Sequence, residues 1–108
     1  MRAAVSIATA GPYPEILNYL KWRPDDEKRA LETLSYFDAM NLAPNVLAPS
    51  FVSIGLVDVI CPPSSVYAAF NHLASKKKEL AIYPGMGHEE TTINVERRMK
   101  WAATHFLD

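Results

Sequence analysis

The chain has 108 residues, which allows one domain at most, and 49% of them are hydrophobic and 21% charged, as in ordinary folded proteins. The formal net charge of −1 argues against binding to nucleic acid or to a membrane surface through overall charge. Cys61 is the sole cysteine and no apolar run approaches the length of a membrane span, so we expect a cytoplasmic chain without disulfides or cysteine-based metal sites.

The first half of the chain, residues 1–45, reads as helical. Pro14 suits the first position of a helix that Pro24 ends, and Asp25 is a plausible N-cap for a second helix that continues to about Met40. Residues 41–49 are expected to connect this region to the next. The apolar positions of the two helices are Ile16, Leu17, Tyr19, Leu20 and Trp22 in the first, and Leu31, Leu34 and Phe37 in the second.

The second half, residues 46–108, predicts a strand, a helix, a second strand and a last helix. The strands are the short apolar runs 51–56 and 79–83, and the helix between them begins at Pro62 and Pro63. Because such a crossover is right-handed, the two strands should be parallel. The last helix is expected to turn four apolar side chains inward, namely Val95, Met99, Ala102 and Phe106.

Two parallel strands are too few for an independently stable sheet, and parallel sheets normally carry cover on both faces. Both strands are nearly continuous apolar segments, which suits interior positions better than exposed edges. The pattern therefore indicates part of a larger α/β protein. We expect the chain to self-associate through the pairing that its sheet lacks.

Two residues that can do chemistry follow the two strands. Asp58 lies in a turn after the first strand, and His88 lies in a Gly85–Gly87 turn after the second, where open α/β sheets place functional loops. In α/β-hydrolases the catalytic triad runs in the order nucleophile, acid, histidine, and this chain presents the last two in that order. The glycines are expected to let the backbone turn sharply and bring the imidazole over the sheet.

More ordinary roles for these and other residues stay open. An aspartate after a strand often only forms a turn, and a Gly-x-Gly-His turn is often no more than a turn. No Gly-x-Ser-x-Gly nucleophile elbow occurs in the chain, and its serines fall in strand or helix-like contexts that do not suit a nucleophile. His72 and His105 are expected on helix surfaces without a metal role, and the lysines at 76–78 as a solvated helix end.

Four stretches resemble the acetyl xylan esterase/cephalosporin C deacetylase family, carbohydrate esterase family seven, in the right order and spacing over essentially the whole chain. The longest, GLVDVICPPSSVYAAFNH at 55–72, is similar to the family's acid segment. TLSYFDAMNLA at 33–43 and GPYPEI at 11–16 resemble it as well, as does IYP at 82–84 running into GHE at 87–89.

The resemblance implies the fold and the roles of four residues. The expected fold is α/β, the C-terminal portion of an α/β-hydrolase, with residues 1–45 as a helical insertion and 46–108 as the unit carrying acid and histidine. Asp58 matches the triad acid and His88 the triad histidine, while Pro12 and Ile60 match positions lining a small acyl pocket. The family's nucleophilic serine and oxyanion hole would lie before Met1.

By resemblance, the activity would be removal of acetyl groups from small substrates such as xylo-oligosaccharides or cephalosporin C, without a cofactor or metal, by an enzyme that forms oligomers. Two hypotheses stay open for the chain itself. It is either a segment of such an esterase, inactive until a nucleophile-bearing half completes it, or a stand-alone truncated protein with a non-enzymatic interaction or structural role.

Overall fold

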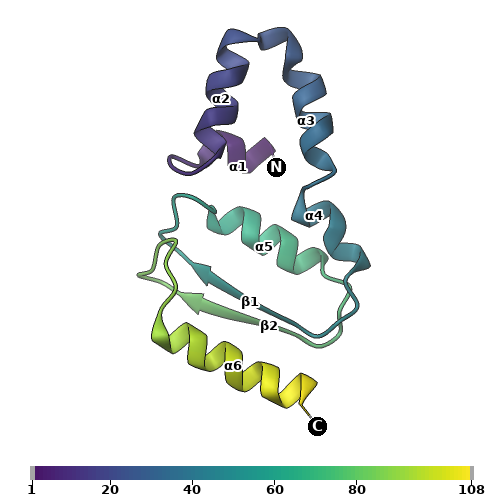
Figure 1. Cartoon of the computed structure of the whole chain (residues 1–108), viewed down its shortest axis with the longest axis vertical. Coiled ribbons are helices and arrows are strands. Elements are labelled where there is room, and N and C mark those ends of the chain that lie inside the picture. The colour runs from purple at the N-terminus through teal and green to yellow at the C-terminus, as the bar shows by residue number, and fades with distance from the viewer. Residues whose placement is uncertain (1, 108) are drawn as a thin grey trace.

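A two-stranded parallel sheet lies at the centre of the second half of the chain. The computed structural model describes residues 2–107. Strands β1 (Ser50–Gly55) and β2 (Lys78–Tyr83) run side by side between helices α5 (Pro63–His72) and α6 (Thr92–Phe106) (Figure 1). The strand–helix–strand–helix order and the parallel pairing expected from the sequence are confirmed.

The pairing register places the ends of the two strands level with each other. Ser50 pairs with Lys78 at one end and Gly55 with Tyr83 at the other. Ile54 and Ala81, one from each strand, are among the most deeply buried apolar residues of the described chain. The turns that follow the two strands therefore both start at the C-terminal end of the sheet.

The N-terminal half is helical but is divided more finely than the sequence predicts. Helix α1 (Arg2–Ile7) buries Ala4 and Val5. The loop after it is joined to the loop after β1 by hydrogen bonds from the Thr9 and Ala10 amides to the Val59 carbonyl oxygen. Helices α2 (Tyr13–Trp22) and α3 (Glu27–Ser35) form an arm that extends away from the sheet (Figure 1). The remaining elements are the 3₁₀ turns η1 (Pro24–Asp26) and η2 (Ala43–Asn45) and the short helix α4 (Ala39–Leu42).

The prediction of one helix from Asp25 to Met40 was wrong in its details. The first turn is 3₁₀, the α-helix has Asp26 rather than Asp25 at its N-cap position, and it ends at Ser35. Asp38 then caps α4, because its carboxylate accepts a hydrogen bond of 3.1 Å from the Met40 amide. The break turns Phe37 outward, and this residue is 75% exposed instead of continuing the apolar stripe.

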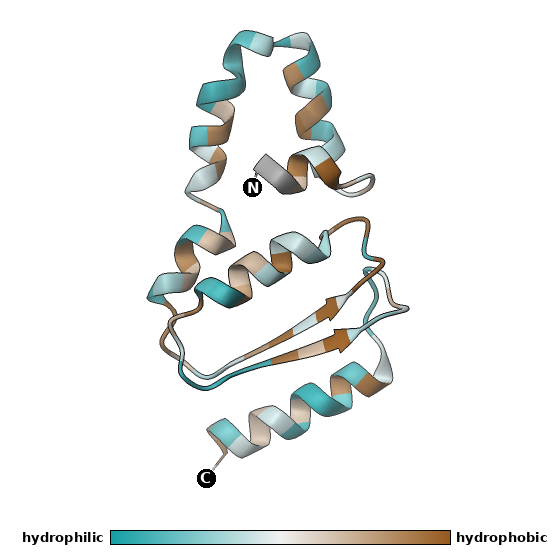
Figure 2. Cartoon of the chain, turned by 180° about the vertical axis from the view of Figure 1, so that it is seen from behind, coloured by the Kyte–Doolittle hydropathy of each residue, from teal (hydrophilic) through white to brown (hydrophobic). Residues whose placement is uncertain are grey.

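Helix α6 was also expected to bury more than it does. Met99 is 62% exposed and Phe106 is 57% exposed, although both were predicted to face inward. The helix contacts β1, and two strands do not provide enough surface to cover its whole apolar face. Ile82 of β2 is exposed as well, and Figure 2 shows hydrophobic segments along both strands.

The lysine run is not a helix end, contrary to the expectation from the sequence. Helix α5 ends at His72, Lys76 and Lys77 lie in the following turn, and Lys78 is the first residue of β2. The Lys78 ammonium donates hydrogen bonds of 3.0 Å to the carbonyl oxygens of both Phe70 and Leu73. A cation at the C-terminal end of a helix satisfies carbonyls that have no partner within the helix, so Lys78 fastens α5 to the sheet.

Gly55 is required by the close approach of the two turns. A Cβ atom at this position would lie 2.6 Å from the carbonyl oxygen of Gly87 and would also collide with the Met86 carbonyl. By contrast, a Cβ at Gly85 would meet no atom within 4 Å. Neither Gly85 nor Gly87 has a positive φ; within residues 2–107 only Gly11 does, at 76°. Neither of these two positions therefore requires glycine in the turn that carries His88.

We expect Gly55→Ala to lower the free energy of unfolding by about 2 kcal/mol, because the added methyl group must push the His88 turn away from β1. Gly85→Ala is the matched control and should change it by less than about 0.5 kcal/mol, since the site is open. Urea denaturation of both variants measures the difference. Equal stability of the two variants would show that Gly55 does not lie against the Met86 and Gly87 carbonyl groups.

Candidate active site

Asp58 is held in place by the backbone of its own loop. One carboxylate oxygen, Oδ1, accepts hydrogen bonds of 2.8 Å from the amides of both Ile60 and Cys61, which close the loop between β1 and α5. The Asp58 side chain is only 9% exposed. This arrangement leaves the second oxygen, Oδ2, free to point away from the loop and toward a partner.

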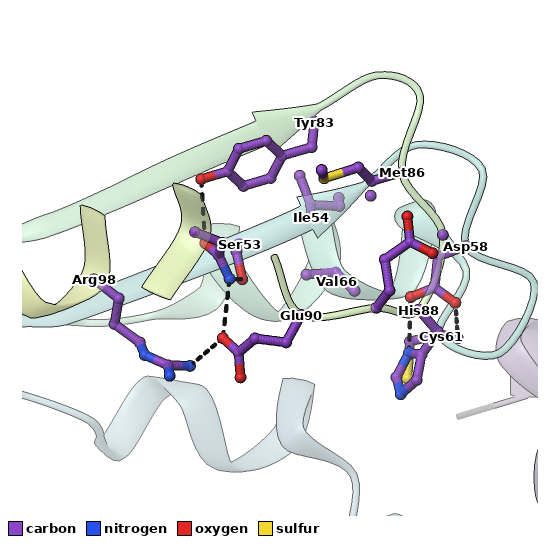
Figure 3. Close-up of a pocket in the computed structure, with 14 residues that line it drawn as sticks. Ser53, Ile54, Asp58, Cys61, Val66, Tyr83, Met86, His88, Glu90 and Arg98 are labelled. Atoms are coloured by element: carbon purple, nitrogen blue, oxygen red, sulfur yellow. Dashed lines mark hydrogen bonds and ion pairs between the residues drawn. The ribbon is translucent and has the colours of Figure 1, made fainter. Parts of the chain in front are cut away.

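That partner is His88, from the turn after β2. The Val57 amide donates a 3.1 Å hydrogen bond to the Met86 carbonyl oxygen and so joins the two turns directly. His88 Nδ1 lies 2.9 Å from Asp58 Oδ2 (Figure 3). With Asp58 ionised, Nδ1 carries the proton and donates it, so that Nε2 is the acceptor nitrogen of the neutral imidazole. The imidazole is half exposed, at 50%, and is accessible to a reacting group.

The surroundings keep the Asp58 carboxylate ionised. Burial by itself would raise the pKa of Asp58, but hydrogen bonds from the Cys61 amide, from His88 and from the Ile60 amide together lower it below the ordinary value of 3.8. Hydrogen bonds to the charged form of a carboxyl group favour that form. At neutral pH Asp58 is therefore a carboxylate, which is the partner that orients the imidazole of a general base.

A pocket of about 530 Å³ opens beside this pair, between the strand ends and α6. Its polar wall is a connected network. Asn94 donates to the Ser53 hydroxyl at 3.3 Å and accepts from the Tyr83 hydroxyl at 3.2 Å. It also donates at 3.4 Å to Glu90, which forms a 2.8 Å ion pair with Arg98 (Figure 3). Ser53 lines the pocket and lies within β1 rather than on a strand-to-helix turn, which is the strand position that the sequence predicts for it.

The two residues expected in an acyl pocket lie apart from this cavity. Pro12 borders a different pocket, between α2 and α3, and Ile60 is not part of the wall around His88. The two residues belong to neighbouring segments, because a Cβ at Gly11 would lie 2.7 Å from Ile60 Cγ2. Their role in binding an acyl group stays a prediction.

Cys61 lies at the same site, although as the sole cysteine it was not expected to bind a metal. Donor atoms of Asp58, Cys61 and His88 all lie within 4.8 Å of one another, so the three side chains form a group that can hold a metal ion. A sole cysteine rules out a site built from several thiols, but it does not rule out a set that combines one thiol with a carboxylate and an imidazole. The spacing Asp-x-x-Cys was the available signal.

His72 and His105 lie on helices, where their Nδ1 atoms bond to backbone carbonyls four residues earlier.

The low pKa of Asp58 predicts a specific acid sensitivity. A carboxyl group whose pKa is lower in the folded state contributes stability above its unfolded pKa, about 3.9, and this stability is lost as the pH falls through the folded pKa. We expect Asp58→Asn to be less stable than the wild type at about pH 6, and the difference to shrink below about pH 4.

Urea denaturation over that pH range measures this difference, with Asp25→Asn, on the exposed arm, as the control. A stability difference between wild type and Asp58→Asn that stays constant down to the lowest pH would contradict a lowered pKa of the Asp58 carboxyl group.

The arrangement can be compared with known proteins. The family model described as acetyl xylan esterase (AXE1) matches residues 1–105. Acetyl esterase Axe7A from Xylanibacter ruminicola is 33% identical over 92 residues, which are 85% of this chain and 20% of that protein. Among residues 2–107, no helix is long and apolar enough to cross a membrane.

Two solved structures are similar in fold and sequence. The acetyl xylan esterase from Paenibacillus sp. R4 superposes with a TM-score of 0.88 at 38% identity, covering 97% of this chain and 34% of that one. Acetyl xylan esterase 1 from Thermoanaerobacterium sp. JW/SL YS485 gives 0.76 at 32% identity, covering 90% and 31%. The chain thus spans about a third of the length of these structures. With its α/β fold and a family match over nearly its whole length, it belongs to the acetyl xylan esterase family.

Proposed function

We propose that the chain provides the acid and the general base of a serine esterase that removes acetyl groups from small substrates, such as xylo-oligosaccharides or cephalosporin C. The observation that carries this proposal is the 2.9 Å hydrogen bond between His88 Nδ1 and Asp58 Oδ2, at the level ends of two parallel strands. Similarity to acetyl xylan esterases supports the substrate class.

In this proposal each member of the pair has a distinct role. Asp58 holds the imidazole in the tautomer with the proton on Nδ1 and stabilises the imidazolium that forms during the reaction. His88 Nε2 takes the proton from a serine hydroxyl as that oxygen attacks the acetyl carbonyl, and then returns it to the leaving alcohol. Water repeats the sequence to release acetate. No metal or cofactor enters these steps.

The serine comes from outside these 108 residues, which contain no Gly-x-Ser-x-Gly elbow. The structures that the chain resembles are about three times as long, and we propose that the corresponding remainder carries the nucleophile and the oxyanion hole. By itself the chain should then be inactive as a serine esterase, because His88 has no serine hydroxyl from which to take a proton. Pro12 and Ile60 would border the acyl group once that part is in place.

A chimera tests the proposal. This chain replaces the matching segment of the Paenibacillus sp. R4 esterase, and hydrolysis of p-nitrophenyl acetate is followed. We expect an active chimera whose kcat/KM falls by roughly 10⁴-fold in His88→Ala, since the serine then has no base. His72→Ala, on the surface of α5, is the matched control and should retain activity. A folded, active chimera whose kcat/KM is unchanged by His88→Ala would overturn the assignment of His88 as the general base.

A second candidate is a stand-alone interaction or structural protein, which the many exposed apolar side chains favour. We propose that the chain self-associates, because its strands offer unpaired edges beside exposed residues such as Ile82.

Sedimentation over a concentration series should show a mass rising above 12.1 kDa. Ile82→Lys should reduce that rise, because a charge at an edge strand opposes pairing, whereas Leu107→Lys should not. A constant monomeric mass would exclude self-association.

A further inference from the structure

Cys61 lies beside the acid–base pair because the Asp58 loop holds it there. The Asp58 carboxylate accepts a 2.8 Å hydrogen bond from the Cys61 amide. This bond holds in place the backbone that carries the Cys61 thiol. The thiol sulfur, a carboxylate oxygen and an imidazole nitrogen all lie within 4.8 Å of one another. The loop after β1 supplies two of these side chains and the turn after β2 supplies the third, so the group depends on the parallel pairing of the strands.

We propose that Asp58, Cys61 and His88 form a binding site for Zn²⁺ or a cation of similar softness. Thiolate, imidazole and carboxylate are the three side-chain ligands that zinc takes in proteins. A tetrahedral zinc ion holds such ligands roughly 3.3–3.6 Å apart, so small side-chain movements bring the three donors to a common centre. Three protein ligands leave the fourth position for water, and the adjoining pocket, whose wall includes all three residues, gives solvent access to it.

The site is organised in advance around Asp58. Because Oδ1 is occupied by two backbone amides, Oδ2 is the oxygen presented to an ion. Hydrogen bonds that orient a ligating carboxylate raise metal affinity. The mixed sulfur, nitrogen and oxygen set favours zinc over Mg²⁺ or Ca²⁺, which prefer oxygen ligands alone.

Binding has a defined proton balance. The Cys61 thiol loses its proton to the solvent and becomes a thiolate. If His88 coordinates through Nδ1, the proton on that nitrogen moves to Nε2 and the imidazole stays neutral. One proton is released for each ion bound. The ion then takes the place of the proton shared by Asp58 and His88.

Zinc binding and general-base catalysis therefore exclude each other at this site, because the ion occupies Asp58 Oδ2 and His88 Nε2 no longer accepts a proton. This consequence rests on the proposed function, whereas the binding of the ion does not. Zinc should inhibit a completed esterase that contains these residues.

Calorimetric titration of the purified, chelator-treated chain with ZnCl₂ tests the site without any need for esterase activity. We expect one ion per chain. Cys61→Ser and His88→Ala should each weaken binding by at least about tenfold, because each removes a ligand. His72→Ala and His105→Ala are controls on helices and should leave the affinity unchanged. Circular dichroism establishes that all variants are folded.

Cobalt identifies the sulfur ligand directly. Co²⁺ added in place of zinc should produce a sulfur-to-cobalt charge-transfer band that disappears in Cys61→Ser. Unchanged zinc affinity in Cys61→Ser, or weakened binding in the His72 and His105 controls, would overturn the proposal. So would the absence of measurable zinc binding by the wild-type chain. None of these results depends on whether the esterase chimera is active, so the two proposals fail separately.

Discussion

The parallel pairing of β1 with β2 is the constraint on which the site depends. Asp58 and His88 are 30 residues apart in the chain, and each follows a strand that ends at the same level of the sheet. The two turns are then joined by the Val57–Met86 backbone hydrogen bond and approach so closely that only glycine fits at position 55. A slip of the register would separate the turns and with them the two side chains.

Asp58 connects the local and the tertiary parts of this arrangement. Its Oδ1 closes its own loop through the Ile60 and Cys61 amides, while its Oδ2 reaches across to His88. A carboxylate that accepts several hydrogen bonds stays ionised although it is nearly buried. Because Oδ1 is bound to the loop, Oδ2 is available for either of the two proposed roles. It can orient the His88 imidazole for proton transfer, or it can bind an ion together with Cys61 and His88.

The rest of the molecule shows what a two-stranded sheet leaves uncovered. Helix α6 keeps Met99 and Phe106 exposed because the sheet is narrower than the helix face, and Ile82 of β2 is exposed for a related reason. Apolar burial is the main favourable term in folding, so faces of this kind are suited to contact with further protein. In the esterases that this chain resembles, the matched segment is only about a third of the whole.

The sequence by itself determined the order of the elements, the parallel strands, and the positions of Asp58 and His88 at the strand ends, because apolar runs, prolines and chain order are local signals. It did not reveal the break after Ser35, the outward Met99, the attachment of Lys78 to α5 or the need for glycine at 55 rather than 85. Those features depend on which surfaces meet. The convergence of Cys61 with the pair was decided in the same way, since a distance between side chains on two separate loops exists only once the strands have paired.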